Sequence, residues 1–238
     1  MTEQEKKVLI SSNSWYHKFD LAGITTPGSC KVAAADSFNN LGIGRLDGLT
    51  AVDVGAWDGP YTFELERRGA KVIAVDIQDP DRTGFNTAKD ILGSKAEYIR
   101  GSVYDLGKLV WDIDLVVFFG VYYHLYNPML AFSNIHKVLR PGGRMLFEGA
   151  VLDGADRVAP YWASNGDKLG MIRQMPMCYF AKNEYCHDSS NWFIPTTLCL
   201  RDWIEASGFV VDRIDKGHTR AYGVATKSNI PSKEHAIV

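Results

Sequence analysis

The chain has 238 residues, 46% of them hydrophobic, and a formal net charge of -2 at pH 7. This length suits one domain with a substantial core and an insertion. The balanced charge does not favour a nucleic-acid binder, and no apolar run is long enough to span a bilayer. The charged N-terminus lacks the apolar segment of a secretory signal. We therefore expect a cytoplasmic protein.

The cysteines do not predict a metal site. Cys30, Cys178, Cys186 and Cys199 form no C-x-x-C pair. Cys178, Cys186 and His187 lie close in sequence, but their spacing fits no standard structural zinc site. We expect reduced thiols and no bound metal.

The first part of the chain reads as alternating strands and helices behind an N-terminal segment. Residues 1–50 are expected to contain helical stretches around a Gly/Pro-rich middle at 23–28. Pro60 suits the first turn of a helix and Gly69 its end. The predicted elements that follow are a strand at 50–54, a helix at 60–68, a strand at 71–76, a helix ending at 92 and a strand near 97–99.

The second part continues this alternation. Residues 112–119 read as a buried strand, because 115–119 form a continuous apolar run, which is typical of a parallel strand covered on both faces. Gly217 allows a hairpin, so the last strand is expected to run antiparallel to its neighbour. The other predicted elements are a helix at 128–139, a strand at 144–148, a helix at 198–206 and strands at 209–215 and 220–225. The pattern predicts a doubly wound α/β fold.

Residues 151–197 interrupt the alternation and are rich in aromatic side chains. A long non-periodic insertion in a compact domain is typical of a lid or binding loop, and an extra packing layer is the alternative. We therefore divide the chain into an N-terminal cover at 1–47, a catalytic domain at 48–227 that contains this insertion, and a polar tail at 228–238.

The most specific motif lies at residues 51–60, where a strand ends at a glycine turn that opens a helix. A dinucleotide site requires G-x-G-x-x-G, but here only Gly55 and Gly59 are glycine and Trp57 and Asp58 fill the turn. A bulky, acidic turn suits a cationic adenosine ligand better than a pyrophosphate. The motif favours a turn that binds S-adenosylmethionine, with S-adenosylhomocysteine as the product. The alternative is a turn with a purely structural role.

Several residues are placed to hold this donor. Asp53, with Asp58 as a second candidate, suits the ammonium of the methionine portion. Asp76 ends the next strand, where it suits both ribose hydroxyls, and a turn or helix cap is the alternative. Ser102 and Val103 suit the adenine edge. The predicted donor-binding residues are Asp53, Gly55, Ala56, Trp57, Asp58, Gly59, Asp76, Ile77, Ser102, Val103, Phe119 and Gly120.

Polar aromatic residues follow the 112–119 strand, where a transferred methyl group meets its acceptor. His124 is a candidate general base, and a histidine bonded to backbone in a tight turn is the alternative. Glu148 and His17 are further candidate bases. Methyl transfer depends mainly on alignment of donor and acceptor, so catalytic residues are harder to identify than donor-binding ones.

Three stretches resemble the class I S-adenosylmethionine-dependent methyltransferases, and more narrowly the branch with the bacterial tRNA wobble-uridine carboxymethyltransferases. They are residues 121–128 (VYYHLYNP), residues 139–148 with LRPGG and LFE, and residues 191–196 (NWFIPT) with the following helix. The resemblance covers residues 48 to 226. It implies a seven-stranded sheet with an antiparallel last strand, and it implies that Asp53, Gly55, Gly59 and Asp76 bind the donor. It also places Tyr123 at the transferred group and matches Arg220 to a late arginine.

The chain departs from that branch in its short N-terminal region. The tRNA enzymes have a longer one, which contributes a lysine for a carboxylated donor, whereas residues 15–20 place no comparable lysine. Short relatives are often associated with small-molecule or sugar pathways. We expect the acceptor to bind between the cover and the insertion. The predicted acceptor-binding residues are Trp15, Tyr16, Tyr122, Asn191, Trp192, Phe193 and Arg220, and the predicted catalytic residues are His124, Tyr123, Glu148 and His17.

The sequence thus predicts a methyltransferase that acts on an oxygen or nitrogen of a small molecule. The alternatives are a tRNA-modifying enzyme, with a basic face from Arg173, Lys182, Lys216, Arg220 and Lys227, and a non-catalytic nucleotide-binding module. We expect a monomer or homodimer.

Overall fold

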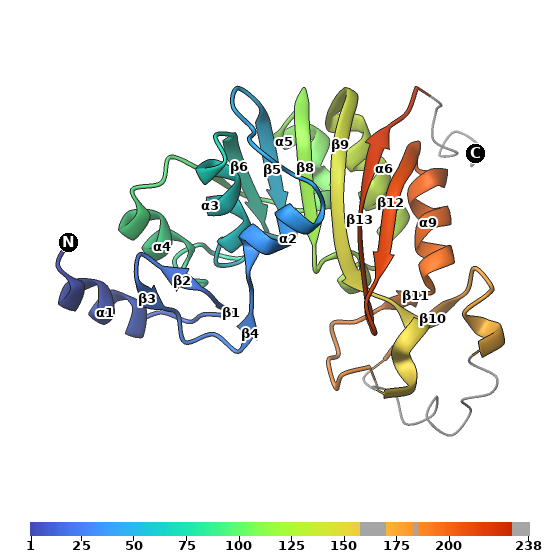
Figure 1. Ribbon diagram of the computed structural model, residues 1–238, viewed down its shortest axis with the longest axis horizontal. Coiled ribbons are helices and arrows are strands. Elements are labelled where there is room, and N and C mark those ends of the chain that lie inside the picture. The colour runs from blue at the N-terminus through green and yellow to red at the C-terminus, as the bar shows by residue number, and fades with distance from the viewer. Residues whose placement is uncertain (158–169, 183–184, 230–238) are drawn as a thin grey trace. The chain divides into compact units, whose positions relative to one another are not determined.

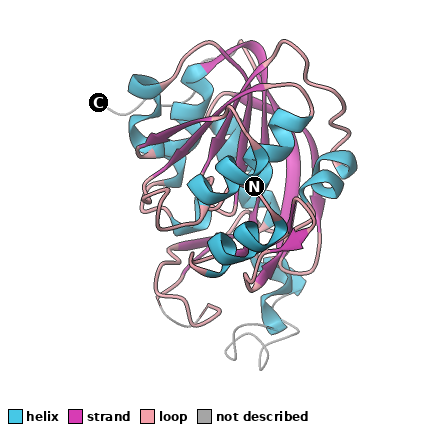
Figure 2. Cartoon of the chain, turned by 90° about the vertical axis from the view of Figure 1, so that its left-hand side faces the viewer, coloured by secondary structure: helices cyan, strands magenta, loops and turns pink. Residues whose placement is uncertain are grey.

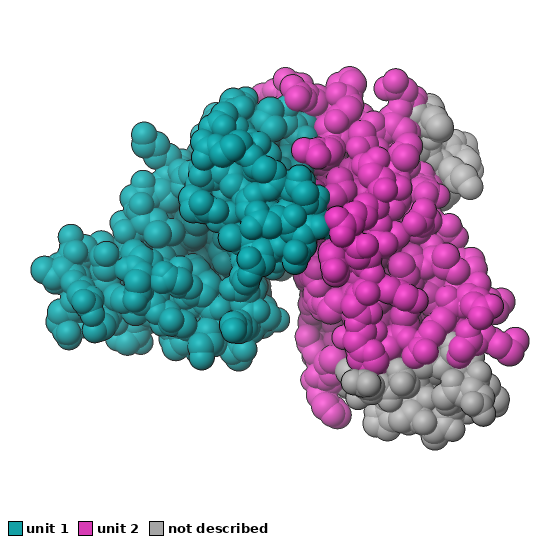
Figure 3. All heavy atoms as spheres, in the orientation of Figure 1, with its two compact units in different colours: residues 1–109, 113–117 teal, residues 110–112, 118–238 magenta. Residues whose placement is uncertain are grey.

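The computed structural model describes residues 1–157, 170–182 and 185–229, and its contacts divide the chain into two compact units (Figure 3). The first unit holds residues 1–109 and 113–117, and the second holds residues 110–112 and 118–238. The elements of the first unit are α1 (Glu3–Ser11), β1 (His17–Lys18), β2 (Asp20–Leu21), β3 (Ile24–Thr25), β4 (Cys30–Lys31), α2 (Ala34–Asn40), β5 (Thr50–Val54), α3 (Pro60–Arg67), β6 (Lys71–Asp76), α4 (Phe85–Leu92), β7 (Glu97–Arg100), the short helix η1 (Val103–Asp105) and α5 (Leu106–Leu109).

Strand β8 (Ile113–Phe119) begins in the first unit and ends in the second. The elements that follow it are η2 (Tyr122–His124), α6 (Pro128–Val138), β9 (Leu139–Ala150), η3 (Leu152–Arg157), β10 (Cys178–Phe180), β11 (Phe193–Pro195), α9 (Thr197–Ala206), β12 (Phe209–Lys216) and β13 (Arg220–Lys227). The expected division into cover, catalytic domain and tail stays a prediction.

Seven strands form one sheet in the order β12-β13-β9-β8-β5-β6-β7 (Figure 1). β5 pairs in parallel with β6 and β8, and β6 pairs in parallel with β7. β13 runs antiparallel to both β9 and β12. The predicted α/β sheet with an antiparallel last strand is therefore confirmed.

The N-terminal segment differs from its prediction, because short strands accompany its helices (Figure 2). β1 pairs in parallel with β4, and β2 pairs antiparallel with β3. This segment also packs on the helix that follows β6, because α1 and β2 both contact α4. Trp15, Leu21 and Phe85 are buried together in one apolar cluster. The segment is thus part of the core of the first unit.

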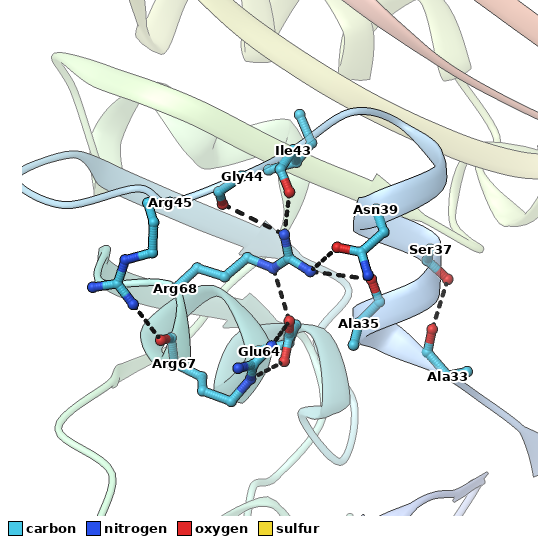
Figure 4. Close-up of polar contacts among 10 residues, drawn as sticks. All are labelled: Ala33, Ala35, Ser37, Asn39, Ile43, Gly44, Arg45, Glu64, Arg67 and Arg68. Carbon is cyan, nitrogen blue, oxygen red and sulfur yellow. Dashed lines mark hydrogen bonds and ion pairs between the residues drawn. The ribbon is translucent and has the colours of Figure 1, made fainter.

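Arg68 joins three parts of the first unit and is 6% exposed (Figure 4). It donates to the backbone carbonyls of Ala35 at 3.1 Å and of Ile43, and to Asn39 Oδ1 at 2.8 Å. Its Nε donates to Glu64 Oε1 at 2.7 Å. The guanidinium therefore joins α3 to α2 and to the segment that follows α2.

In the second unit, α6 packs on β9 and α9 packs on β12. β9 begins at Leu139, five residues before the predicted strand, because Leu139 already has extended backbone angles. Its pairing with β13 runs from Arg144 to Ala150, so it begins at the predicted residue and extends two residues beyond the predicted end. Within the 151–197 insertion the structure describes η3 and the antiparallel pair β10 and β11. Residues 158–169 and 183–184 of this insertion, and most of the tail, lie outside the described residues.

Candidate active site

The turn after β5 has a backbone that requires glycine. Gly55 and Gly59 have φ of 82° and 87°. A Cβ on Gly59 would lie 2.5 Å from the Phe63 ring and 2.9 Å from the Phe85 ring. Within the turn, Trp57 also has a positive φ, and its side chain is 37% exposed. The turn is therefore tightly closed on its inner side and presents an aromatic side chain outward.

Asp76 ends β6 with its carboxylate fixed by backbone. Oδ2 accepts the N–H of Trp57 at 2.9 Å, and Oδ1 accepts the N–H of Gln78 at 2.8 Å. Each oxygen keeps a lone pair, so the carboxylate can still accept two hydroxyl hydrogen bonds. This arrangement fits the predicted ribose contact. The neighbouring Ile77 is 63% exposed and is available to cover a ligand.

Asp53 is buried at 2% exposure, and its Oδ2 accepts the Thr62 hydroxyl at 2.6 Å. Burial raises the pKa of Asp53 to about 6, a rise that the Thr62 hydrogen bond opposes and the Asp76 charge increases. Such a carboxyl is costly to ionise without a cation nearby. A positively charged ligand beside it would lower that cost.

We predict that Asp53→Asn stabilises the ligand-free protein at pH 8 but not at pH 4. Because the pKa of Asp53 is raised on folding, the ionised carboxyl disfavours the folded state, and stability falls as pH rises from 3.8 towards 6. An amide avoids this penalty and can still accept the Thr62 hydroxyl. Thermal melts at both pH values measure the effect, and an equal change at both would contradict it.

Asp58 fixes the N-terminal segment to the donor turn. Its carboxylate is fully buried, and Oδ2 accepts the backbone N–H groups of Tyr16 at 2.9 Å and His17 at 2.8 Å. Oδ1 contacts His17 Nδ1. The Tyr16 ring lies 5.7 Å from the Trp57 ring. The structure therefore gives Asp58 and His17 an anchoring geometry, and their predicted donor and base roles stay predictions.

Asp58→Ala is expected to release this segment from the turn. Hydrogen bonds to a charged group contribute about 1.5 to 3 kcal/mol each, so the loss of two such bonds should cost the docked segment about 3 kcal/mol or more. Limited proteolysis between residues 12 and 33 measures the release. Asp20→Ala is the matched control, because Asp20 is exposed and accepts only from the nearby Gly23 N–H in the contacts described. Equal cleavage of both variants would contradict the anchoring role.

Trp15 and Ser102 have partners within the first unit. Trp15 is buried at 9% exposure, and its Nε1–H donates to the Ile10 carbonyl at 2.7 Å. Ser102 caps η1 through Tyr104 N–H at 3.2 Å, and the neighbouring Val103 is buried. Trp15 therefore has a core environment, although it was predicted to bind the acceptor.

In the second unit, Tyr123, Glu148 and Arg220 form one cluster. Arg220 Nε and Nη2 donate to the two carboxylate oxygens of Glu148 at 2.6 and 2.7 Å. Its Nη1 donates to the Tyr123 hydroxyl at 3.0 Å. Burial raises the pKa of Tyr123, so its hydroxyl stays protonated and can donate to another group. Gly120 directly follows Phe119 in the chain, and its backbone N–H donates to the Glu148 carbonyl at 2.9 Å.

Tyr122 faces the core. It is fully buried, and its hydroxyl donates to the Ala150 carbonyl at 2.7 Å. Its ring occupies the space where a Cβ on Gly149 would lie, at 2.4 Å. This geometry packs Tyr122 against β9, although it was predicted to contact the acceptor.

The turn before β11 brings three other predicted residues near Tyr123. Asn191 is buried, and its Nδ2 donates to the Tyr185 carbonyl at 2.9 Å. Trp192 N–H donates to the Tyr123 carbonyl at 2.8 Å. The Phe193 ring lies 5.4 Å from the Phe180 ring, on the β10–β11 pair. The Trp192 hydrogen bond joins this loop to η2, whereas Asn191 and Phe193 contact residues of the insertion itself.

Residues 52–147 match the family model of a methyltransferase domain. The matched range includes the turn after β5, the acid that ends β6 and the aromatic turn after β8. This part of the chain is similar to a methyltransferase domain. Such a domain implies S-adenosylmethionine as the methyl donor, and the glycine turn with Asp53 and Asp76 fits that ligand.

The methyltransferase domain has curated relatives. The chain is 26% identical to the tRNA U34 carboxymethyltransferase of Cellvibrio japonicus, over 68% of this chain and 46% of that protein. It is also 26% identical to the tRNA U34 carboxymethyltransferase of Campylobacter hominis, over 69% of this chain and 51% of that protein. The chain thus spans about half the length of the curated relatives it matches.

Solved structures share the fold. The N-terminal domain of EvdMO1 with S-adenosylhomocysteine bound has a TM-score of 0.67 at 15% identity, over 96% of this chain and 97% of that chain. The 1,6-didemethyltoxoflavin-N1-methyltransferase of Burkholderia thailandensis, with its substrate and S-adenosylhomocysteine, has a TM-score of 0.59 at 17% identity. It covers 82% of this chain and 76% of that chain. The fold is that of S-adenosylmethionine-dependent methyltransferases.

Sequence reasoning missed three residues of the methyltransferase domain and its insertion. Thr62 donates to Asp53, Ser190 is hydrogen-bonded to His124, and Asp188 accepts from Ser190. Thr62 lies in the first turn of α3, directly after the glycine turn, so it was close enough to Asp53 in sequence to be considered. Asp188 and Ser190 lie far from His124 in sequence, so no local pattern could have found them.

Two further findings concern metals and membranes. Among the described residues, no group of three or more His, Cys, Asp and Glu side chains is arranged to hold a metal ion. The helices of that same part of the chain are too short or too polar to cross a bilayer.

Proposed function

We propose that the protein transfers a methyl group from S-adenosylmethionine to an oxygen or nitrogen of a small molecule. The observation that carries this proposal is the glycine turn with two acids, Asp53 and Asp76, whose carboxyl groups still suit a cation and two hydroxyls. Tyr123 and His124, after β8, supply polar groups for the acceptor. The family match to a methyltransferase domain supports the same activity.

The paired state of Arg220 favours an ordinary donor over a carboxylated one. A second carboxylate on the donor needs a cation that is not already neutralised. Arg220 forms two parallel hydrogen bonds with Glu148, which is a strong geometry for an arginine and a carboxylate. A carboxylated donor would have to displace Glu148 and would leave a partly buried carboxylate without its partner.

Two solved relatives support a small acceptor. The Burkholderia thailandensis enzyme holds 1,6-didemethyltoxoflavin, a small heterocycle. The EvdMO1 N-terminal domain was also solved in the presence of D-fucose, with 96% of this chain covered. A small-molecule acceptor is consistent with the near-neutral net charge of this chain.

Calorimetry with S-adenosylmethionine and S-adenosylhomocysteine tests the donor half of the proposal. We expect saturable binding of both, and no binding at millimolar concentration would contradict it. Incubation of metabolite extracts with methyl-labelled donor, followed by mass spectrometry, tests the acceptor half. Label in a small product supports the proposal, and label only in RNA would contradict it.

A tRNA acceptor is the second candidate, because the curated relatives are tRNA U34 carboxymethyltransferases. It needs an available basic face. Three of the basic side chains suggested for this face already have partners. Lys216 pairs with Asp153 at 3.4 Å, Arg220 pairs with Glu148, and Lys227 Nζ donates to the Leu139 carbonyl at 2.6 Å. Retention of tRNA on the protein at low salt would favour this candidate. A non-catalytic module would instead bind donor without turnover in any extract.

A further inference from the structure

His124 is connected to a carboxylate through a serine. Ser190 Oγ lies 2.9 Å from His124 Nδ1 and 2.6 Å from Asp188 Oδ1. The backbone N–H of Ser190 also donates to Asp188 Oδ1, at 2.8 Å. The three side chains thus form a chain of hydrogen bonds from Asp188 to the imidazole.

The direction of each hydrogen bond follows from the chemistry of the groups. The Ser190 hydrogen bonds lower the pKa of Asp188, so this carboxylate is ionised at neutral pH and only accepts. The single hydroxyl proton of Ser190 therefore points to Asp188. Oγ must then accept from His124, which places a proton on Nδ1. The lone pair of the neutral imidazole is consequently on Nε2.

The surroundings keep this imidazole neutral. Burial lowers the pKa of His124, the Asp188 charge opposes this change, and the Arg220 charge adds to it. Among the described residues, the charges that act on His124 are those of Asp188 in the loop before β11 and Arg220 on β13. Tyr123, on the same turn as His124, interacts in turn with Glu148 on β9 and with Tyr185. The Tyr123 ring lies 4.2 Å from the imidazole.

We propose that His124 Nε2 is the general base of the methyl transfer, that Asp188 and Ser190 are positioning residues that fix its tautomer, and that the acceptor group is a hydroxyl. This proposal rests on the proposed function and deepens it. An uncharged amine needs no base before it attacks, whereas a hydroxyl becomes a much better nucleophile when its proton is removed. A dedicated relay to His124 therefore favours oxygen as the acceptor atom.

The proposed step balances in atoms and charge. Nε2 takes the acceptor's hydroxyl proton while an electron pair of that oxygen forms the bond to the methyl carbon. The electrons of the broken carbon–sulfur bond remain on sulfur. The products are a methyl ether, S-adenosylhomocysteine and the protonated His124, which then releases its proton to solvent.

The tautomer can be measured without donor or acceptor. Long-range ¹H–¹⁵N NMR spectra of the full chain, with His124 assigned through His124→Gln, should show Nδ1 protonated and Nε2 unprotonated at pH 7.5. In Ser190→Ala the Nε2-protonated tautomer should increase, and the control Ser189→Ala should resemble the wild type. A wild-type imidazole that is cationic or protonated at Nε2, or a Ser190→Ala spectrum like that of the wild type, would overturn the relay. Near-ultraviolet circular dichroism checks that each variant is folded.

The kinetic test uses labelled donor and the extract fraction that accepts the label. Ser190→Ala and Asp188→Asn should lower kcat by about 10- to 100-fold, with the KM for donor unchanged. Activity of the wild type should rise with pH through the pKa of His124. Asp188→Asn removes a negative charge that raises this pKa, so the acidic limb should move to lower pH.

The outcomes of the two proposals are separable. If no fraction accepts label, the proposed function fails, while the NMR spectra still decide the tautomer. If label is transferred and Ser190→Ala is as active as the wild type, only the relay is overturned. Methylation of nitrogen in the labelled product would overturn the hydroxyl assignment.

Discussion

Asp76→Ala is expected to weaken binding of S-adenosylmethionine by about 100-fold, which corresponds to about 2.7 kcal/mol. The proposed donor loses two hydroxyl hydrogen bonds to a carboxylate, and each such bond contributes about 1.5 kcal/mol or more. The variant also removes the acceptors for the N–H groups of Trp57 and Gln78. Calorimetric titration with donor measures the change in Kd.

Asp81→Ala is the control for this prediction. Asp81 lies in the same loop and is exposed, and its carboxylate accepts the Asn86 amide at 2.7 Å. We expect its donor Kd to stay within about twofold of the wild type, because exposed polar contacts contribute little. A similar loss in both variants would mean that Asp76 acts through loop stability and does not contact the donor.

The elements that carry the predicted donor residues could be located from the sequence because their determinants are local. A strand, a glycine turn, a helix that begins with Pro60 and a second strand that ends at Asp76 lie within a few tens of residues. Periodicity and turn chemistry suffice to place these elements. Asp53 and Asp76 lie near the same edge of the sheet because β5 pairs in parallel with β6 and both residues are close to the carboxyl ends of these strands.

The roles of the aromatic residues could not be predicted in the same way. Trp15 and Tyr122 have polar groups and lie beside functional motifs, yet their hydrogen bonds go to the backbone of Ile10 and Ala150. For Tyr122 the deciding feature is the missing side chain of Gly149, which is distant in sequence. Packing of this kind depends on the tertiary structure, and a single sequence carries no signal for it.

Asp58 shows the same limit for a charged residue. Its position in the glycine turn suggested a ligand contact, but its partners are Tyr16 and His17, about forty residues earlier in the chain. The short strands of the N-terminal segment were missed for a related reason. Each has two residues, which is too few for a hydrophobic period to be visible.

Arg68→Ala is expected to lower the free energy of unfolding by about 3 to 5 kcal/mol, the largest loss of stability that we predict. Arg68 is buried and donates to the carbonyls of Ile43 and Ala35 as well as to Asn39 and Glu64 (Figure 4). Alanine would remove the Arg68 donors from Ile43, Ala35 and Asn39, while Glu64 would keep its hydrogen bonds to Arg67. It would also open space beside the Phe38 ring, which lies 5.3 Å from the guanidinium carbon. Urea denaturation of Arg68→Ala and of the wild type measures the change in the free energy of unfolding.

Arg67→Ala separates burial from charge in this prediction. Arg67 donates to the same Glu64 carboxylate at 2.6 Å through Nε and Nη2, but its side chain is 66% exposed, whereas that of Arg68 is 7% exposed. Exposed ion pairs contribute about 0 to 1 kcal/mol, so Arg67→Ala should be almost as stable as the wild type. Both variants remove one positive charge beside Glu64. The difference between them therefore measures the buried carbonyl contacts of Arg68, and equal losses would show that the ion pair alone carries the effect.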